Sequence, residues 1–274
     1  QGPVGPAGPQ GEPGPAYTAG ENISISGSVI ATKAFPCNPN LLDNWYFGNP
    51  VNQRGASGTI NTAGYFFDRW KLVSGSVTIN SGGIVLNGTI AQVLEYAAGQ
   101  TVTATVLTPD GVTDVTPVYD DETKTFTVTT QGKTIRAVKL ELGTQQTLAH
   151  QENGAWGLNE IPDYGEQLRR CQRYCFVWGY GAKKTSCLAV MQCVQPGVLF
   201  GLIPTPVTMR NNPVVTGGRL TTFAGNVTSL GNLITCANGI RAVANIEGTS
   251  TSQGQAVGIE NADDNGRVIF SADL

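Results

Sequence analysis

The sequence predicts an all-β homotrimer in which a collagen-like stub precedes two β-sandwich domains of jelly-roll type, joined by a short helix. Glycine fills 35 of 274 positions and charged residues make up only 14% of the chain, against a usual charged share of about 25%. Strand-sized segments separated by Gly, Asn and Asp turns follow one another along most of the chain, which is typical of sandwiches. The third observation is a run of Gly-X-Y triplets at the start of the chain.

Residues 2–16 read GPV-GPA-GPQ-GEP-GPA, with a proline in every triplet. Only glycine fits at the crowded axis of three wound polyproline chains, so this strict period predicts a collagen triple helix rather than a disordered linker. A triple helix requires three chains, and we therefore expect a homotrimer. The glycines expected at its axis are Gly2, Gly5, Gly8, Gly11 and Gly14. Because the chain begins inside the repeat without methionine, we interpret it as the trimmed end of a longer protein.

Polar and turn-rich stretches place the domain boundaries. After the stalk over 1–16, we expect a β linker over 17–39, a β-sandwich over 40–143, a connector over 144–161, a short axial helix over 162–176 and a terminal β-sandwich over 177–274.

The helix is predicted from its start signal and its apolar face. Asp163 is followed three residues later by Glu166, which is the spacing of a capping box. Leu168, Cys171 and Cys175 recur at helical spacing, opposite a row of arginines. We expect this face to pack near the threefold axis and to contribute to trimerisation.

Six cysteines would suit a disulfide framework in a small secreted domain, but this chain is long enough to bury a core without them. We expect buried free thiols. Cys171, Cys175, Cys187 and Cys193 could supply a zinc site, yet their C-x3-C and C-x5-C spacings depart from those common in structural sites. We expect neither a metal nor a cofactor. A structural calcium ion is compatible with such sandwiches, although no loop places its ligands.

Several function classes are disfavoured by composition and motifs. A net charge of −3 argues against nucleic acid as a partner. The most apolar run, 187–203, is interrupted by Gln, Pro and Gly and falls short of the ~20 residues of a membrane span. A catalytic triad would depend on His150 alone. Adjacent acids at 120–122 and 263–264 lie in expected turns, so we predict no enzyme, with a two-carboxylate polysaccharide depolymerase kept as an alternative.

Residues between 43 and 70 match the composition of carbohydrate sites, where sugar rings stack on aromatic faces and polar side chains bind hydroxyl groups. We expect Trp45 and Trp70 to lie in the core. Packing within the sandwich remains an equal alternative for the rest of this region. The candidate glycan-binding residues are Tyr46, Tyr65, Asn52, Gln53, Arg54 and Arg69.

Blocks of the sequence also resemble a known family. NLLDNWYFGNPVNQRG at 40–55, with GYFFDRW at 64–70, resembles the carbohydrate-binding-module-like sandwich of phage tail and fibre proteins from gut Firmicutes. That domain typically closes with a Lys-Leu-Glu-x-Gly strand, matched here at 139–143. GEQLRRCQRY at 165–174 resembles the entry to the C-terminal domain of many phage fibres. The cysteine-rich run 171–193 departs from the aromatic residues usual there.

The resemblance implies a tail or head fibre at the virion surface that adheres to bacterial surface polysaccharide or mucin glycan. Its other partners would be virion proteins, reached through a preceding part of the chain, and no membrane is involved. Three alternatives stay open. They are a structural fibre without a ligand, a polysaccharide depolymerase and a bacterial collagen-like surface adhesin.

Replacing Tyr46 and Tyr65 by alanine is expected to weaken glycan binding without unfolding the protein, because ring stacking is lost while the core tryptophans remain. A glycan array on the purified variants measures this. Unchanged binding would remove these residues from the site.

Overall fold

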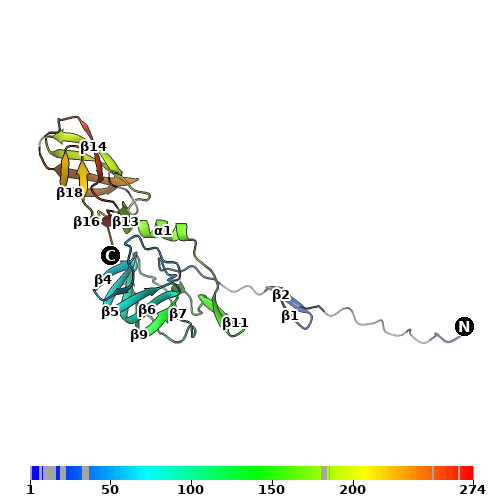
Figure 1. Ribbon diagram of the computed structural model, residues 1–274. Coiled ribbons are helices and arrows are strands. Elements are labelled where there is room, and N and C mark those ends of the chain that lie inside the picture. The colour runs from blue at the N-terminus through cyan, green and yellow to red at the C-terminus, as the bar shows by residue number, and fades with distance from the viewer. Residues whose placement is uncertain are drawn as a thin grey trace. The chain divides into compact units, whose positions relative to one another are not determined.

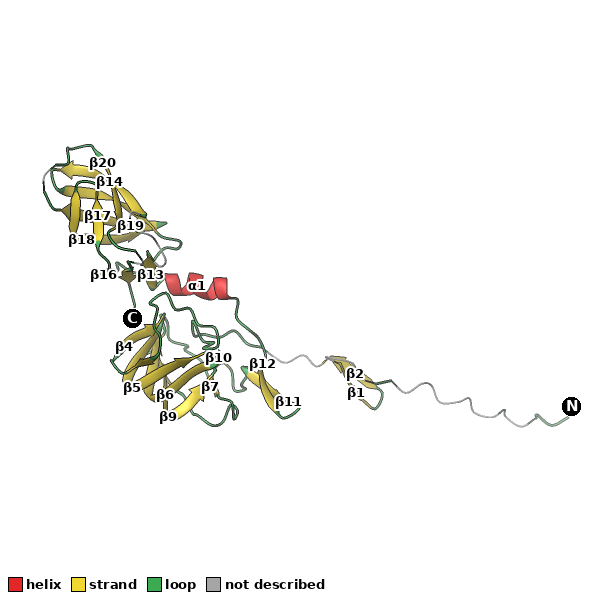
Figure 2. Cartoon of the chain, in the orientation of Figure 1, coloured by secondary structure: helices red, strands yellow, loops and turns green. Residues whose placement is uncertain are grey.

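The structure, a computed structural model, is mostly β with one short helix among the described residues, as the sequence predicts (Figures 1 and 2). The chain divides into two compact units, Gln1–Pro36 and Cys37–Leu274. The structure describes residues 2–5, 8, 17–18, 23–32, 37–179, 184, 186–248, 250–264 and 266–273.

The first unit contains an antiparallel hairpin of β1 (Ile23–Ser26) and β2 (Val29–Thr32). Gly27 sits in the turn with φ of 59°, a left-handed conformation that glycine adopts at little steric cost. Within the β linker expected over 17–39, the described residues 23–32 therefore form a two-stranded hairpin.

Three of the stalk glycines, Gly2, Gly5 and Gly8, belong to the described part of the chain. A Cβ atom added to any of them would meet no atom within 4 Å in the single chain. Gly11 and Gly14 lie outside the described residues. The triple helix and the homotrimer stay predictions, because a single chain cannot form either.

The second unit begins with a β-sandwich. Its larger sheet has the order β3-β5-β6-β9-β8 with β4 paired to β5, and its smaller sheet pairs β10 with β7. All of these pairs are antiparallel. The strands are β3 (Thr59–Ile60), β4 (Gly64–Phe67), β5 (Trp70–Asn80), β6 (Gly83–Val93), β7 (Val102–Leu107), β8 (Val118–Asp120), β9 (Thr125–Ile135) and β10 (Ala137–Leu142).

Aromatic packing fills the core of this sandwich. Trp45 and Trp70 are 2% and 0% exposed, which confirms that both are core residues. The Trp70 ring packs edge-on against Phe47 and Phe126, with centroid distances of 5.2 and 6.2 Å. Such T-shaped pairs add about 0.5–1.5 kcal/mol beyond the area they bury.

The polar stretch 144–161, predicted as a connector, contains a hairpin of β11 (Ala149–Glu152) and β12 (Ala155–Leu158). Its turn is Asn153-Gly154, with both φ angles positive. Asn-Gly is a strong signal for a two-residue hairpin turn, and it outweighs the polar composition of the flanking residues.

The helix α1 (Tyr164–Gln172) begins where the capping signal predicts, because the Asp163 carboxylate accepts a hydrogen bond of 2.7 Å from the Glu166 amide. It ends before the expected residue 176, so Cys175 lies in the following strand. Cys171 and Cys175 are 0% exposed and Leu168 is half-buried. The two thiols therefore pack inside their own chain, and the structure does not place them on a surface between copies. No helix in the described part of the chain is long and apolar enough to cross a membrane.

The terminal domain is a closed barrel rather than the predicted sandwich. Its strand order is β14-β15-β19-β18-β17-β20, and a separate three-stranded sheet has the order β13-β21-β16. The short strand β17 pairs with both β18 and β20 and so closes the sheet on itself. The strands are β13 (Cys175–Trp178), β14 (Cys187–Gln195), β15 (Val198–Pro204), β16 (Val214–Thr216), β17 (Leu220–Thr222), β18 (Gly225–Cys236), β19 (Gly239–Ile246), β20 (Ala256–Asn261) and β21 (Val268–Ser271).

All six cysteines are free, and Cys171, Cys175 and Cys193 are buried as expected. Cys37 and Cys187 are exposed, which the sequence did not predict. Burial raises the pKa of the Cys175 thiol and holds that of Cys171 well above its ordinary value. The two buried thiols therefore stay protonated at neutral pH.

A buried carboxylate fastens the sandwich to the final strands. Asp68 is 0% exposed, and its Oδ2 accepts a hydrogen bond of 2.7 Å from the Gln53 amide. Arg54 lies between Asp68, at 3.9 Å, and Asp273, with which it forms an ion pair. The Gln53 side chain donates to the Cys175 carbonyl at 2.8 Å. Residues 53 and 54 thus join the sandwich to both ends of the terminal domain.

Burial raises the pKa of Asp68 from 3.8 to about 6, so ionised Asp68 opposes folding at neutral pH. The folded chain takes up this proton as the pH falls from about 6 to about 4, while the unfolded chain takes it up mainly at and below pH 4. Wild-type protein should therefore gain about 2 kcal/mol in unfolding free energy relative to Asp68→Asn over that range. Urea titrations of both proteins between pH 4 and pH 7 measure this.

Asp114→Asn provides a control with the opposite sign. The pKa of the exposed Asp114 is lowered by a hydrogen bond from Lys133, so wild-type protein should lose stability relative to this variant as the pH falls. If the unfolding free energies of wild-type and Asp68→Asn proteins changed with pH in the same way, the raised pKa of Asp68 would be contradicted.

Candidate functional site

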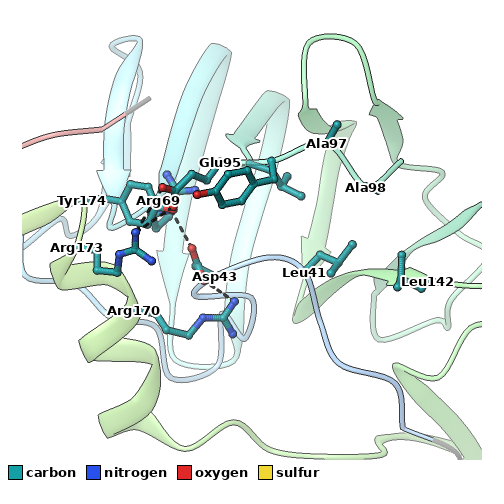
Figure 3. Close-up of a pocket in the computed structure, with 12 residues that line it drawn as sticks. Leu41, Asp43, Arg69, Glu95, Ala97, Ala98, Leu142, Arg170, Arg173 and Tyr174 are labelled. Atoms are coloured by element: carbon teal, nitrogen blue, oxygen red, sulfur yellow. Dashed lines mark hydrogen bonds and ion pairs between the residues drawn. The ribbon is translucent and has the colours of Figure 1, made fainter. Parts of the chain in front are cut away.

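A pocket of about 360 Å³ lies between the sandwich and helix α1 (Figure 3). Apolar side chains from the sandwich line part of it, and charged and aromatic residues line the rest. The charged and aromatic residues are Asp43, Arg69, Glu95, Tyr96, Arg170, Arg173 and Tyr174.

The base of the pocket is an ion-paired carboxylate, Asp43. Arg69 Nε donates to its Oδ2 at 3.1 Å, and Arg170 approaches its Oδ1 at 2.7 Å. Arg69 also donates to the Val93 carbonyl at 2.6 Å. Asp43 and Arg69 are 7% and 2% exposed. Since each carboxylate oxygen meets one guanidinium, the buried charge is well compensated.

One wall of the pocket is formed by Tyr174, just after α1. The Arg69 guanidinium lies 3.6 Å from the centroid of its ring, a favourable cation–π geometry. Its hydroxyl donates to Glu95 Oε2 at 3.0 Å. Burial raises the pKa of Tyr174 to about 12, so this hydroxyl remains protonated and keeps its donor role at neutral pH.

The rim carries an exposed aromatic ring beside charged groups. Tyr96 is 75% exposed, and the neighbouring Glu95 lies 3.3 Å from Arg173 of the helix. The segment that bears Tyr96 is held by Asp121, whose Oδ1 accepts a hydrogen bond of 2.7 Å from the Ala98 amide. An exposed ring next to paired donors and acceptors is an arrangement that suits a sugar.

Arg69 is the one residue, of the six predicted to bind glycan, that lines this pocket. Gln53 and Arg54 bond to Cys175 and Asp273, respectively, as described above. Asn52 closes its own loop through two hydrogen bonds with the Ala56 backbone, of 2.8 and 2.9 Å. These side chains have structural tasks within the chain.

The two predicted tyrosines are half-buried. One face of the Tyr65 ring lies 5.0 Å from the Arg54 guanidinium. The Tyr46 ring packs beside Trp45, with a centroid distance of 6.4 Å, and lies over Gly48. Glycan binding by these residues stays a prediction.

Sequence reasoning missed Tyr96, Glu95, Arg173 and Tyr174 as site residues. Arg173 and Tyr174 belong to the block that resembles phage fibres, yet nothing local indicated that they face Glu95. The pairing joins residues 78 and 79 positions apart, so it follows from the tertiary fold alone.

The acidic clusters that were candidates for a catalytic pair contain carboxylates that bond to nearby groups of the chain. Asp120 accepts a hydrogen bond of 2.9 Å from the Glu122 amide, and Asp263 pairs with Arg219 at 3.5 Å. His150 Nδ1 lies 2.7 Å from Asn159 Oδ1. Within the described ranges, no cluster of three or more His, Cys, Asp and Glu residues could hold a metal ion.

Comparison with protein-family models, curated proteins and solved structures gives no match to this chain. The fold and the pocket define a mostly β protein with a mixed aromatic and charged surface site, and its function is inferred from that geometry.

Asp43→Ala is expected to destabilise the protein by about 3–5 kcal/mol, because it leaves the buried Arg69 guanidinium without its carboxylate. Asp110→Ala serves as the control. Asp110 is an exposed carboxylate 3.8 Å from Lys133, and its loss should cost less than about 1 kcal/mol. Urea titrations of both variants measure the difference. Equal losses of unfolding free energy would show that the buried Asp43–Arg69 ion pair stabilises the fold no more than an exposed one.

Proposed function

We propose that this chain belongs to a trimeric phage fibre that projects from the virion and adheres to bacterial surface glycans or mucin. The observation that carries the proposal is the strict Gly-X-Y run over 2–16 in the same chain as a β-rich unit with an aromatic and charged pocket. The run requires three chains, so three copies of the pocket would act together.

The pocket has the size and chemistry for one or two sugar rings. Its volume of about 360 Å³ lies at the lower end of the range for small-molecule sites. Tyr96 offers a ring face for stacking, and Glu95 and Arg173 offer an acceptor and donors for hydroxyl groups. Single sites of this kind bind weakly, and linking three of them raises the effective affinity.

Apolar side chains on the outside of the barrel support association of several copies. Val190 on β14 is 64% exposed, and Phe200 and Leu202 on β15 are 41% and 46% exposed. Alternation along the strands puts them on the outer face, opposite the buried Met191 and Leu199. Clustered apolar exposure of this kind marks an interaction surface, and the Gly-X-Y run favours copies of the same chain as its occupants.

Glycan-array and whole-bacterium binding of the purified full chain, with its mass checked by light scattering, tests the proposal. We expect a trimer whose binding falls about tenfold or more in Tyr96→Ala, since each of three sites loses a stacking contact. Tyr17→Ala is the control, because Tyr17 is also 75% exposed but lies outside the pocket.

Other outcomes would select among the alternatives. A trimer that binds no glycan would favour a structural fibre, and release of reducing ends would indicate a depolymerase. Loss of binding in the Tyr46 and Tyr65 variants but not in Tyr96→Ala would move the site to the region predicted from sequence.

A further inference from the structure

A second hollow, of about 550 Å³, lies beside the pocket and shares Arg170 and Arg173 with it. It is formed by the arginine-bearing face of α1 and by the loop over 207–210. Arg169 and Arg210 join the two shared arginines in its lining, with Glu166 as its one carboxylate. The two hollows, here called the arginine groove, therefore flank the same row of guanidinium groups.

Positive charge exceeds negative charge in the arginine groove, although the chain as a whole has a net charge of −3. Five guanidinium groups line it against three carboxylates. Asp43 is shared by two arginines, and Glu95 and Glu166 pair with one each. The excess is two positive charges within one concave surface, where charges of one sign reinforce each other's field.

Arg210 is the arginine of the groove that the structure pairs with no carboxylate among the described residues. Its Nη1 donates to the Ala272 carbonyl at 3.2 Å, and its Nε is buried and has no hydrogen-bond partner within the described part of the chain. Within the same described ranges, Arg69 Nη1 is likewise buried without a partner, in a residue that is 2% exposed and lines the groove. The two guanidiniums lie 5.8 and 3.6 Å from the Tyr174 ring centroid.

The excess positive charge of the groove points to an anionic ligand, as does Arg210, which lines the second hollow and pairs with no carboxylate among the described residues. Arginine keeps its proton at any physiological pH, so this charge is always present. The planar guanidinium fork suits the paired oxygens of a carboxylate or a phosphate. A neutral sugar alone would leave the excess charge of the groove uncompensated.

We propose that the arginine groove binds an acidic glycan, with the carboxylate of a uronic acid or the phosphate of a sugar phosphate on Arg169, Arg173 and Arg210 and the adjoining ring on Tyr96. This inference rests on the proposed glycan adhesion and specifies its ligand class. The acidic group supplies the acceptor oxygens, while Tyr96 supplies the contact that distinguishes a glycan from another polyanion.

The test compares binding of the full chain to polygalacturonate, its carboxyl-reduced neutral form and a teichoic acid whose repeat is a sugar phosphate, poly(N-acetylglucosamine 1-phosphate). We expect binding at least tenfold tighter to one acidic polymer than to the neutral one, weakening as salt rises. Preference for polygalacturonate identifies a carboxylate ligand, and preference for teichoic acid a phosphate ligand.

Arg169→Gln and Arg219→Gln form a matched pair of variants. Both side chains are largely exposed, at 67% and 72%, and each pairs with one carboxylate, but only Arg169 lines the groove. Arg169→Gln should weaken acidic-polymer binding several-fold, Arg169→Lys should restore part of it, and Arg219→Gln should leave it unchanged. Arg210→Gln should weaken it further, with folding checked by thermal melting.

Three results would overturn the inference. Equal binding of acidic and neutral polymers would refute the ligand class and leave glycan adhesion standing. Binding to none of the polymers or arrayed glycans would refute both proposals. A DNA oligonucleotide that binds as tightly as the acidic polymers, and with no dependence on Tyr96, would make the groove a general polyanion surface.

Discussion

The carboxylate of Asp43 is the centre on which the rest of the site depends. It holds Arg69 of the sandwich and Arg170 of the helix at once, and so fixes the position of α1 against the sheet. Two buried charges gain little net stability over a well-packed apolar contact, because desolvation offsets most of their attraction. Their directional hydrogen bonds instead select one arrangement of the two elements, and this arrangement creates the pocket.

The same ion pairs explain why the surface next to α1 suits a charged ligand. Each acid of the groove is already bonded to an arginine of the chain, so the acids do not repel an incoming anion as free carboxylates would. Arg173, whose ion pair with Glu95 is 3.3 Å long, and Arg210, which pairs with no carboxylate among the described residues, both line the hollow. In the proposed complex with an acidic glycan, fold stability and ligand recognition would depend on the same arginines, whose positions are set by the carboxylates.

Residue patterns predicted the parts of the fold that depend on near neighbours. The core positions of Trp45 and Trp70, the cap at Asp163 and most strand-sized segments followed from side-chain type and spacing. The hairpin at Asn153-Gly154 was also indicated by its Asn-Gly turn, but the polar composition of residues 144–161 led to the prediction of a connector. Of the site residues, Arg69 was identified as a candidate from the sequence. Gln53 and Arg54 were also candidates, but they bond to Cys175 and Asp273 of the same chain. Their side-chain types could not reveal this, because amide and guanidinium groups hydrogen-bond to a sugar as readily as to protein groups.

The sequence by itself determined the all-β character, the Gly-X-Y period and the helix start, because backbone preferences and side-chain periodicity act over a few residues. Tertiary structure decided that β17 closes the terminal strands into a barrel, that Cys171 and Cys175 are buried within their own chain, and that Tyr174 meets Glu95 and Arg69. Each of these features depends on which distant segments pack together. The packing that forms is the one that leaves the least unpaired polar surface buried and the least apolar surface exposed in the chain as a whole, and no single segment determines it.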